Sequence, residues 1–337
     1  MRAIIAITAA LAVVAGVMYF SQQTPATRML KVNTPIESAW TQWKQTQGKS
    51  YGNNSEEQYR FGVFTENYAK VNTFNAQGET SRLSLNQFAD LTQVEFKNIY
   101  LGYKKPAFMK SNMVAQFNTS NLKSSVNWVT SGAVGAVKDQ GQCGSCWAFS
   151  AVSSTETANY LQKKLSSPPS YSEQQLVDCA GGSYGNQGCN GGLMDQAFEY
   201  IKTHPLMTEA EYGYTAQDGS CRYQKSKGVG TVSAYTDVTP NSPDQLRAAL
   251  NRQTVSVAIE ADQSVFQFYT SGVITSGCGQ QLDHGVTAVG YGTEGGDDYF
   301  LVRNSWGASW GASGYVKIGA SSSNVCGILS QPSFPTA

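Results

Sequence analysis

The sequence predicts an α+β fold in which a helical part comes first and a β part follows. Helical spacing of apolar residues dominates residues 122–228, and short β-branched runs separated by glycine-rich turns dominate residues 229–337. Residues 21–121 have no cysteine and carry 11 Lys and Arg against 7 Asp and Glu, whereas residues 122–337 hold all seven cysteines and carry 12 Lys and Arg against 17 Asp and Glu. A separate, mainly helical element, such as a pro-segment, is therefore expected over residues 21–121.

Composition limits the classes of function. The 337 residues are 41% apolar and 14% charged, with a formal net charge of zero. These values are typical of a folded chain with a sizeable core and exclude a long coiled coil or a solvated charged tail. The chain has no run of five Lys or Arg, so nucleic acid is not expected as a partner.

The first 20 residues have the pattern of a secretory signal peptide. One charge, Arg2, precedes an unbroken apolar run over residues 3–20. An uncleaved signal anchor is the alternative, because an apolar run of this length could just span a bilayer and no small-x-small cleavage motif follows Phe20. In both cases the rest of the chain is expected to enter the secretory pathway.

Residues 21–121 are expected to contain one long amphipathic helix. Apolar residues recur near helical spacing from Glu56 onward, with Gly62 as the one internal break. They are Tyr59, Val63, Tyr68, Val71 and Phe74. A turn-like and strand-like stretch with Phe88 as an apolar anchor follows at residues 83–91, and the polar residues 104–121 are expected to form a linker.

Three helices are expected in the helical part. The first begins at Cys146 and stops before Pro168, and the second starts with a capping box of Ser172 and Gln175. The third has an apolar face made by Met194, Ala197, Phe198 and Ile201.

The β part is expected to form a small antiparallel barrel or sheet. A short helix begins within it at Ser242-Pro243. The expected strands lie in residues 231–238, 254–261, 284–291, 299–306 and 314–319.

Seven cysteines in an exported chain predict a mostly oxidised set with one thiol left over. Cys143 and Cys146 form a C-x-x-C pair with three interpretations. A zinc site is disfavoured because a second C-x-x-C or a histidine pair at ligand spacing is missing, and a thioredoxin-type redox pair is disfavoured because no strand–helix unit of that kind precedes it. In the third interpretation Cys143 is oxidised to a distant partner and Cys146 stays free at a helix N-terminus, where the dipole favours the thiolate.

Two histidines are available as a base for such a thiol. His204 precedes Pro205 at the end of a helix and is expected to be a solvated helix-terminal residue. His284 begins a strand with Gly285 beside it, so its ring can meet a partner without crowding. A structural role for His284 is equally compatible with that position.

Residues 141–150, GQCGSCWAFS, closely resemble the nucleophile segment of papain-like cysteine proteases. The histidine-bearing DHGV and the asparagine-bearing RNSWG follow, with His284 and Asn304 lying 138 and 158 residues after Cys146. The segments SVNW, SEQQLVDC, GCNGG and NSWGASWGASGY extend the resemblance over almost all of residues 122–337. The resemblance implies the papain-like two-lobed fold, a helical lobe beside an antiparallel β-barrel lobe, with the active site in the cleft between them.

Catalytic roles are carried over from this resemblance. Cys146 matches the nucleophile, His284 the general acid/base, and Asn304 the residue that orients the imidazole ring. Gln140 matches the side-chain donor of the oxyanion hole, whose other donor is the backbone N–H of Cys146. Trp306 is expected to shield the contact between His284 and Asn304 from water.

The resemblance also implies the disulfide bonds and the substrate cleft. It pairs Cys143 with Cys189, Cys179 with Cys221, and Cys278 with Cys326; the residues alone support only the count of three, since six cysteines allow 15 pairings. The residues expected to line the cleft and its main specificity pocket are Gly191, Gly192, Leu193, Met194, Ala258, Leu282, Asp283, Trp306 and Gln331. The apolar members favour a bulky apolar substrate residue two positions before the scissile bond, and Gln331 could admit a polar or basic one.

The pro-segment resembles that of the cathepsin L-like subgroup. Two of its motifs are present, with Val71 where isoleucine is usual and Ser84 in place of a glycine. The matching residues are Glu56, Arg60, Phe64, Asn67, Val71 and Asn75 in the first motif, and Asn86, Phe88 and Asp90 in the second.

The expected protein is a cysteine endopeptidase made as a zymogen. It comprises a signal peptide (1–20), an inhibitory pro-segment (21–121) and a catalytic domain (122–337). An exopeptidase loop with a histidine pair is not expected, because both histidines are already placed. Sequons at Asn53 and Asn118 fall in the pro-segment, so any N-glycans are expected to leave with it, and the mature chain is expected to begin near Leu122.

The expected partners are protein and peptide substrates, the chain's own pro-segment and cystatin-like inhibitors. A monomer without cofactor or metal is expected, in a lysosome-like acidic vacuole or secreted. Two alternatives from other classes remain: a catalytically inactive papain-like binding protein, and a secreted thiol–disulfide oxidoreductase.

Overall fold

The computed structural model describes residues 35–104 and 114–337. The signal peptide expected over residues 1–20 and part of the expected linker lie outside the described residues. The chain divides into two units, Met1–Gln42 and Trp43–Ala337. Helix α2 (Pro35–Gln47) begins in the first unit, of which residues 35–42 are described. No helix in the described part of the chain is long and apolar enough to cross a membrane.

The pro-segment is built around the long helix α3 (Asn54–Ala76), which confirms the expected helix. Its buried face differs from the expected one, because Tyr59 is 51% exposed whereas Phe64 and Asn67 are buried. Asn53 caps it by accepting a hydrogen bond from the Glu56 N–H at 2.9 Å. Strand β1 (Ser81–Leu83) and helix α4 (Gln93–Tyr100) follow. Helix α4 begins with a full capping box of Thr92 and Glu95, in which each side chain bonds to the other residue's backbone N–H.

Two asparagines of the first pro-segment motif fix the chain that follows α3. The buried Asn67 donates to the carbonyl oxygens of Ala89 and Leu91, both at 3.0 Å. Asn75 donates to the Leu83 carbonyl at 2.9 Å and accepts from the Leu83 N–H at 3.0 Å. These side chains bond to backbone groups of Leu83, Ala89 and Leu91, so they set the path of residues 83–91.

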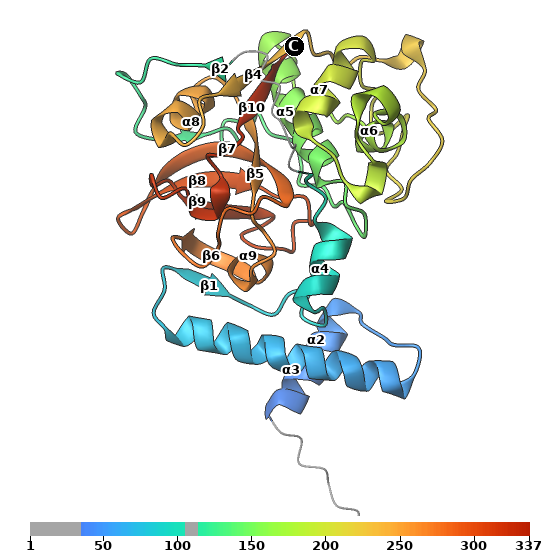
Figure 1. Ribbon diagram of the computed structural model, residues 1–337, viewed down its shortest axis with the longest axis vertical. Coiled ribbons are helices and arrows are strands. Elements are labelled where there is room, and N and C mark those ends of the chain that lie inside the picture. Colours follow the sequence, from blue (N-terminus) through green and yellow to red (C-terminus); the bar gives the residue numbers. More distant parts are fainter. Residues whose placement is uncertain (1–34, 105–113) are drawn as a thin grey trace, which may run out of the picture. The chain divides into compact units, whose positions relative to one another are not determined.

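The helical lobe contains α5 (Cys146–Gln162), α6 (Glu173–Cys179) and α7 (Met194–Thr203). Figure 1 shows α5 between the sheet and the other two helices, and it packs against both. Its residues are buried continuously from Cys146 to Asn159 for this reason. Helix α5 ends at Gln162, well before Pro168, so the proline does not end the helix as expected.

The expected capping box at the start of α6 is half formed. Ser172 Oγ accepts from the Gln175 N–H at 3.0 Å, as expected. The Gln175 side chain does not return to Ser172, because its Oε1 accepts the N–H of Met207 at 2.7 Å. Tertiary contact thus outweighs the local cap at this position.

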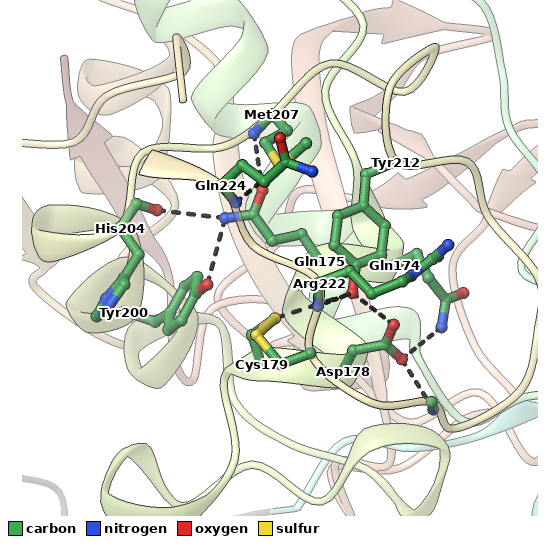
Figure 2. The surroundings of a disulfide bond; sticks show 12 residues. Gln174, Gln175, Asp178, Cys179, Tyr200, His204, Met207, Tyr212, Arg222 and Gln224 are labelled. Carbon is green, nitrogen blue, oxygen red and sulfur yellow. Dashed lines mark hydrogen bonds between the residues drawn. A yellow bond between two sulfur atoms is a disulfide. The ribbon is translucent and has the colours of Figure 1, made fainter. Parts of the chain in front are cut away.

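A disulfide bond joins the end of α6 to the loop after α7, through Cys179 and Cys221. Figure 2 shows the polar groups around it. The carboxylate of Asp178 accepts from the Tyr212 hydroxyl at 2.7 Å and from Gln174 Nε2 at 2.8 Å. The bond and these hydrogen bonds hold the loop of the helical lobe against α6.

Within the described residues the sheet has ten strands, in the order β1-β6-β9-β8-β7-β5-β10-β4-β2, with β3 paired to β7. Most pairs are antiparallel, as expected, but β6–β9 and β2–β4 are parallel. Parallel pairing needs a long connection, and β7 and β8 supply one between β6 and β9. The strands are β2 (Val114–Ala115), β3 (Val126–Asn127), β4 (Ala234–Val238), β5 (Val255–Ile259), β6 (Tyr269–Ile274), β7 (His284–Glu294), β8 (Asp297–Arg303), β9 (Tyr315–Gly319) and β10 (Ser333–Thr336).

Two short helices complete this lobe, α8 (Pro243–Leu250) and α9 (Ser264–Gln267). Ser242 caps α8 and Pro243 is its first residue, which confirms the expected start. Both strands at the ends of the sheet order, β1 and β2, come from the residues before 122.

Candidate active site

Cys146 is the first residue of α5 and is fully buried. Its Sγ accepts a hydrogen bond from the Gly285 N–H at 3.3 Å. Gly285 follows His284 at the start of β7, so this bond joins the helix N-terminus to the strand that carries the histidine. A Cβ on Gly285 would lie 3.0 Å from Met194 Sδ, so a glycine allows the close approach.

His284 is held by an amide and an indole ring. Its Nε2 lies 2.8 Å from Asn304 Oδ1, which also accepts the Ser305 N–H at 2.8 Å. Because an amide oxygen accepts, Nε2 carries the proton and Nδ1 is left as the basic nitrogen; Nδ1 has no hydrogen-bond partner. The Trp306 ring stacks on the imidazole with centroids 4.7 Å apart and covers this pair.

Gln140 presents an amide donor beside Cys146. Ser305 Oγ donates to Gln140 Oε1 at 2.7 Å and fixes the orientation of the amide. Gln140 Nε2 donates to the Cys143 carbonyl and to the Tyr100 carbonyl, both at 2.8 Å. The second acceptor belongs to the pro-segment, so a pro-segment carbonyl occupies the donor that a reacting carbonyl oxygen could use.

The structure contains three disulfide bonds: Cys143–Cys189, Cys179–Cys221 and Cys278–Cys326. They are the pairs that the resemblance implied. Cys146 is free. Because Cys143 is bonded to Cys189, the interpretation of Cys143 and Cys146 as a thioredoxin-type redox pair is wrong.

Residues after α4 pass directly over the thiol. The Gly192 N–H donates to the Gly102 carbonyl at 2.8 Å, and the Tyr103 N–H donates to the Asp283 carbonyl at 2.9 Å. A Cβ on Gly102 would lie 1.8 Å from the Gly144 carbonyl oxygen, and one on Gly191 would lie 2.5 Å from the Gly102 oxygen. Only glycine fits at these positions, because such distances are far below van der Waals contact.

The side chain of Tyr103 fills the expected specificity pocket. It belongs to one buried cluster with Cys146, and Leu193 is half-buried against the cluster. Its hydroxyl donates to Gln331 Oε1. The pocket residues in that cluster are Met194, Ala258 and Leu282.

Burial controls the ionisation of the thiol and the imidazole. It raises the pKa of Cys146 to about 11, although backbone N–H groups of Gly285 and Gly102 oppose it. It lowers the pKa of His284 to about 4, against the effect of Asn304. At neutral pH the pair is therefore a thiol and a neutral imidazole while the pro-segment is bound, and the ion pair expected of the free enzyme is not favoured in this state.

The second pro-segment motif packs over Trp306. The rings of Phe88 and Phe96 meet the indole edge-on, with centroids 5.2 and 5.3 Å away. Asn86 Nδ2 donates to the Gln267 carbonyl at 2.7 Å. Asp90 lies inside the pro-segment, where it accepts from Lys49 at 3.0 Å.

Other expected pro-segment residues lie away from the thiol. Arg60 bonds to the Asp90 carbonyl and to Glu95. Phe64 and Val71 are buried in α3, and Glu56 is exposed. The two sequon asparagines, Asn53 and Asn118, are exposed.

Sequence reasoning missed the pro-segment residues that touch the site, namely Tyr100, Gly102 and Tyr103. It also missed Lys97, which pairs with Asp262 at 2.7 Å and Asp283 at 3.4 Å. The available signal was a glycine that lies between two tyrosines in Tyr100-Leu101-Gly102-Tyr103, just before the expected linker.

The comparisons with known proteins agree with this geometry. Residues 122–336 match the papain family of cysteine proteases, and residues 40–96 match the cathepsin propeptide inhibitor domain. Cysteine proteinase RD21A of Arabidopsis thaliana is 44% identical over 310 residues, which cover 89% of this chain and 66% of that protein. Digestive cysteine proteinase 1 of Homarus americanus is 42% identical over 309 residues, covering 88% of this chain and 94% of that protein.

Solved structures of precursors share the fold. Digestive procathepsin L 3 of Tenebrio molitor larval midgut matches with a TM-score of 0.81 at 38% identity, over 90% of this chain and all of that one. A recombinant stem bromelain precursor matches with a TM-score of 0.82 at 35% identity, over 90% of this chain and 99% of that one. The chain therefore belongs to the papain family of cysteine proteases, as a cathepsin L-like cysteine endopeptidase that carries its own propeptide inhibitor domain.

Proposed function

We propose that Cys146 attacks the scissile peptide carbonyl and forms an acyl-enzyme. His284 Nδ1 takes the thiol proton and returns it to the leaving amine, while Asn304 holds the ring in the required tautomer. Gln140 Nε2 and the Cys146 N–H stabilise the oxyanion. The observation that carries this proposal is the hydrogen bond from Gln140 to the Tyr100 carbonyl beside the buried thiol. The intact set of groups argues against an inactive binding protein.

We propose that the pocket occupied by Tyr103 selects the residue two positions before the scissile bond. Its apolar wall favours a bulky side chain, such as Leu, Phe or Val. The hydrogen bond from the Tyr103 hydroxyl to Gln331 adds a polar acceptor at the pocket base. A hydroxyl-bearing aromatic residue therefore joins the apolar ones as a candidate.

The direction of the chain explains why the pro-segment is not cut. In a substrate, the pocket residue comes before the reacting carbonyl. Here the pocket residue, Tyr103, comes three positions after Tyr100, whose carbonyl accepts from Gln140. The pro-segment thus runs opposite to the proposed substrate, and no scissile bond is presented to Cys146.

The wider organisation is part of the same proposal. We divide the chain into a signal peptide (1–20), a pro-segment (21–121) and a catalytic domain of two lobes (122–228 and 229–337). It enters the secretory pathway and acts in an acidic vacuole or after secretion, as a monomer that cystatin-like inhibitors could block. N-glycans are proposed at Asn53 and Asn118.

We propose that acid activates the zymogen through Glu95. This carboxylate caps α4 and pairs with Arg60 at 2.9 Å. Burial opposes its ionisation, but hydrogen bonds from Thr92 and the Arg60 charge prevail and lower its pKa below the usual 4.5. Its stabilising effect is therefore present above pH 4.5 and is lost as the pH falls through the lowered pKa. Protonation loosens α4, which carries Phe96 and Lys97 onto the catalytic domain.

Replacing the nucleophile tests the catalytic assignment. Cys146→Ala is expected to abolish peptide hydrolysis while leaving the three disulfide bonds intact, as checked by intact mass under non-reducing conditions. Asn304→Ala should retain more activity, because the imidazole can still sample the productive orientation. Appreciable turnover by Cys146→Ala would contradict the assignment.

The reactivity of the thiol should change on maturation. In the zymogen, alkylation of Cys146 by iodoacetamide is expected to rise only towards pH 11, because burial raises its pKa to about 11. The mature enzyme should react at pH 6 more than about a hundredfold faster, since exposure lets the ion pair form. Cys146→Ala gives the background rate. An unchanged pH profile after pro-segment removal would rule this explanation out.

Gly102 should be essential for latency. A methyl group at this position would meet the Gly144 carbonyl at 1.8 Å, so Gly102→Ala is expected to raise zymogen activity at pH 7 at least about tenfold, the effect of losing 1.4 kcal/mol of binding. Gly62→Ala is the matched control, because a Cβ there has nothing within 4 Å. The same activity in both variants would show that the close approach is not needed.

Neutralising Glu95 should weaken the acid switch. In a Cys146→Ala zymogen cut by a trace of mature enzyme, Glu95→Gln should be processed at higher pH than the parent and depend less on pH below 4.5. Rates are normalised to a small peptide at each pH. Glu66→Gln, an exposed change on α3, should behave as the parent. Identical midpoints for both variants would exclude Glu95 as the switch.

A further inference from the structure

A second contact between pro-segment and catalytic domain lies outside the cleft. Strand β2 pairs in parallel with β4, Val114 opposite Asp237 and Ala115 opposite Val238. Thr239 adds two hydrogen bonds to the Ala115 carbonyl, from its N–H at 3.3 Å and its hydroxyl at 3.0 Å. Figure 1 shows β2 next to β4, close to β10. These residues lie beyond 40–96, the part that matches the inhibitor domain.

Phe117 continues this contact with both its backbone and its ring. Gln245 on α8 accepts the Phe117 N–H at 2.7 Å and donates to the Phe117 carbonyl at 2.9 Å, as a neighbouring strand would. The Phe117 ring meets Phe334 with centroids 6.1 Å apart. The Arg252 guanidinium lies 4.8 Å from the ring centroid, within the range of a cation–π contact.

We propose that β4, Gln245, Arg252 and Phe334 form a second docking site whose occupant is residues 114–117 of this chain, and that it keeps this segment on the catalytic domain after the inhibitory part has been cut away. The segment is covalently continuous with the catalytic domain. A cut before Val114 therefore frees the inhibitory part but leaves the strand, Phe117 and the Asn118 sequon attached, which replaces the mature start near Leu122 expected from the sequence.

Acid is expected to strengthen docking at this site, whereas protonation of Glu95 weakens the inhibitory part of the pro-segment. Asp237 is 5% exposed, and its Oδ1 has no hydrogen-bond partner. Burial, reinforced by Asp195, raises its pKa to about 7. Asp237 lines a small cavity together with Val114 of β2, and β10 and the turn before it close this cavity with Ser333, Gln331 and Ser330. Among the described residues that line it, Asp195 is the one other charged residue.

The direction of the pH effect follows from that raised pKa. Docking is stabilised while Asp237 is protonated, and the stabilisation is lost as the pH rises through about 7. An ionised Asp237 beside Asp195 would lie unpaired under β2, which disfavours the docked state. Acid thus loosens α4 at Glu95 while it favours the second site.

The test uses the full-length Cys146→Ala zymogen, so it does not depend on the proposed catalytic activity. Trypsin is suited to the cut, because the sequence has a lysine at 110 and none from 114 to 121. After trypsin is removed and the inhibitory part is separated at pH 4, intact mass should show a catalytic fragment that begins at Ser111. Amide hydrogen exchange of residues 114–117 is then measured and expressed as protection factors at pH 5 and pH 8.

We expect these amides to remain protected in the cleaved protein, more strongly at pH 5 than at pH 8. Gln245→Leu should lower their protection at least about tenfold, since it removes two hydrogen bonds. Gln116→Leu is the matched control, because Gln116 is exposed. Asp237→Asn should make the protection independent of pH.

Three results would overturn the proposal. The first is a fragment that lacks residues 114–117. The second is exchange of these amides at the rate of unstructured chain in the parent, and the third is equal protection in Gln245→Leu and the parent. Each result leaves the catalytic assignment untouched, because that assignment is tested by hydrolysis in the mature enzyme.

Discussion

The close approach of Gly102 to the N-terminus of α5 is the constraint on which the latent state depends. A side chain at this position would strike the Gly144 carbonyl, so the backbone itself covers the thiol. Burial raises the pKa of the Cys146 thiol and lowers that of the His284 imidazole, although the Gly102 N–H itself opposes the effect on the thiol. The covered site therefore excludes substrate and also disfavours the thiolate.

Ion pairs contribute less to the interface between pro-segment and catalytic domain than the opposite net charges of residues 21–121 and 122–337 suggest. Lys97 does pair with the largely buried Asp262 and Asp283, but the lysine side chain is 45% exposed, so water and salt screen the attraction. The ion pairs of Lys49 and Arg60 lie within the pro-segment. Aromatic rings on Trp306, backbone hydrogen bonds to Gly192 and Asp283, and the pairing of β1 with β6 supply uncharged contacts across the interface. The electrostatic effect of acid thus acts on the folding of the pro-segment more than across the interface.

Residues whose role follows from local pattern or from a chemical motif could be predicted. Helices α3, α7 and α8 follow from apolar spacing and caps, and Cys146, His284 and Asn304 follow from the motifs around them. Positions decided by distant partners could not. Gln175 abandons its local cap for Met207, and the parallel pairing of β6 with β9 depends on the whole sheet. No local pattern marks Gly102 and Tyr103, because their role depends on the thiol and the pocket that the folded catalytic domain places next to them.

Removal of the pro-segment takes edge strands away from the sheet of the catalytic domain. Strands β1 and β2 stand at the two ends of the strand order, and both precede residue 122. An uncovered edge presents unpaired backbone groups that invite pairing with another chain. Loss of β1 uncovers β6, whose Gly272 contacts Thr80 so closely that a Cβ would lie 2.1 Å from the Thr80 carbonyl oxygen. A domain that keeps residues 114–117 leaves β4 covered, so it has one open edge instead of two.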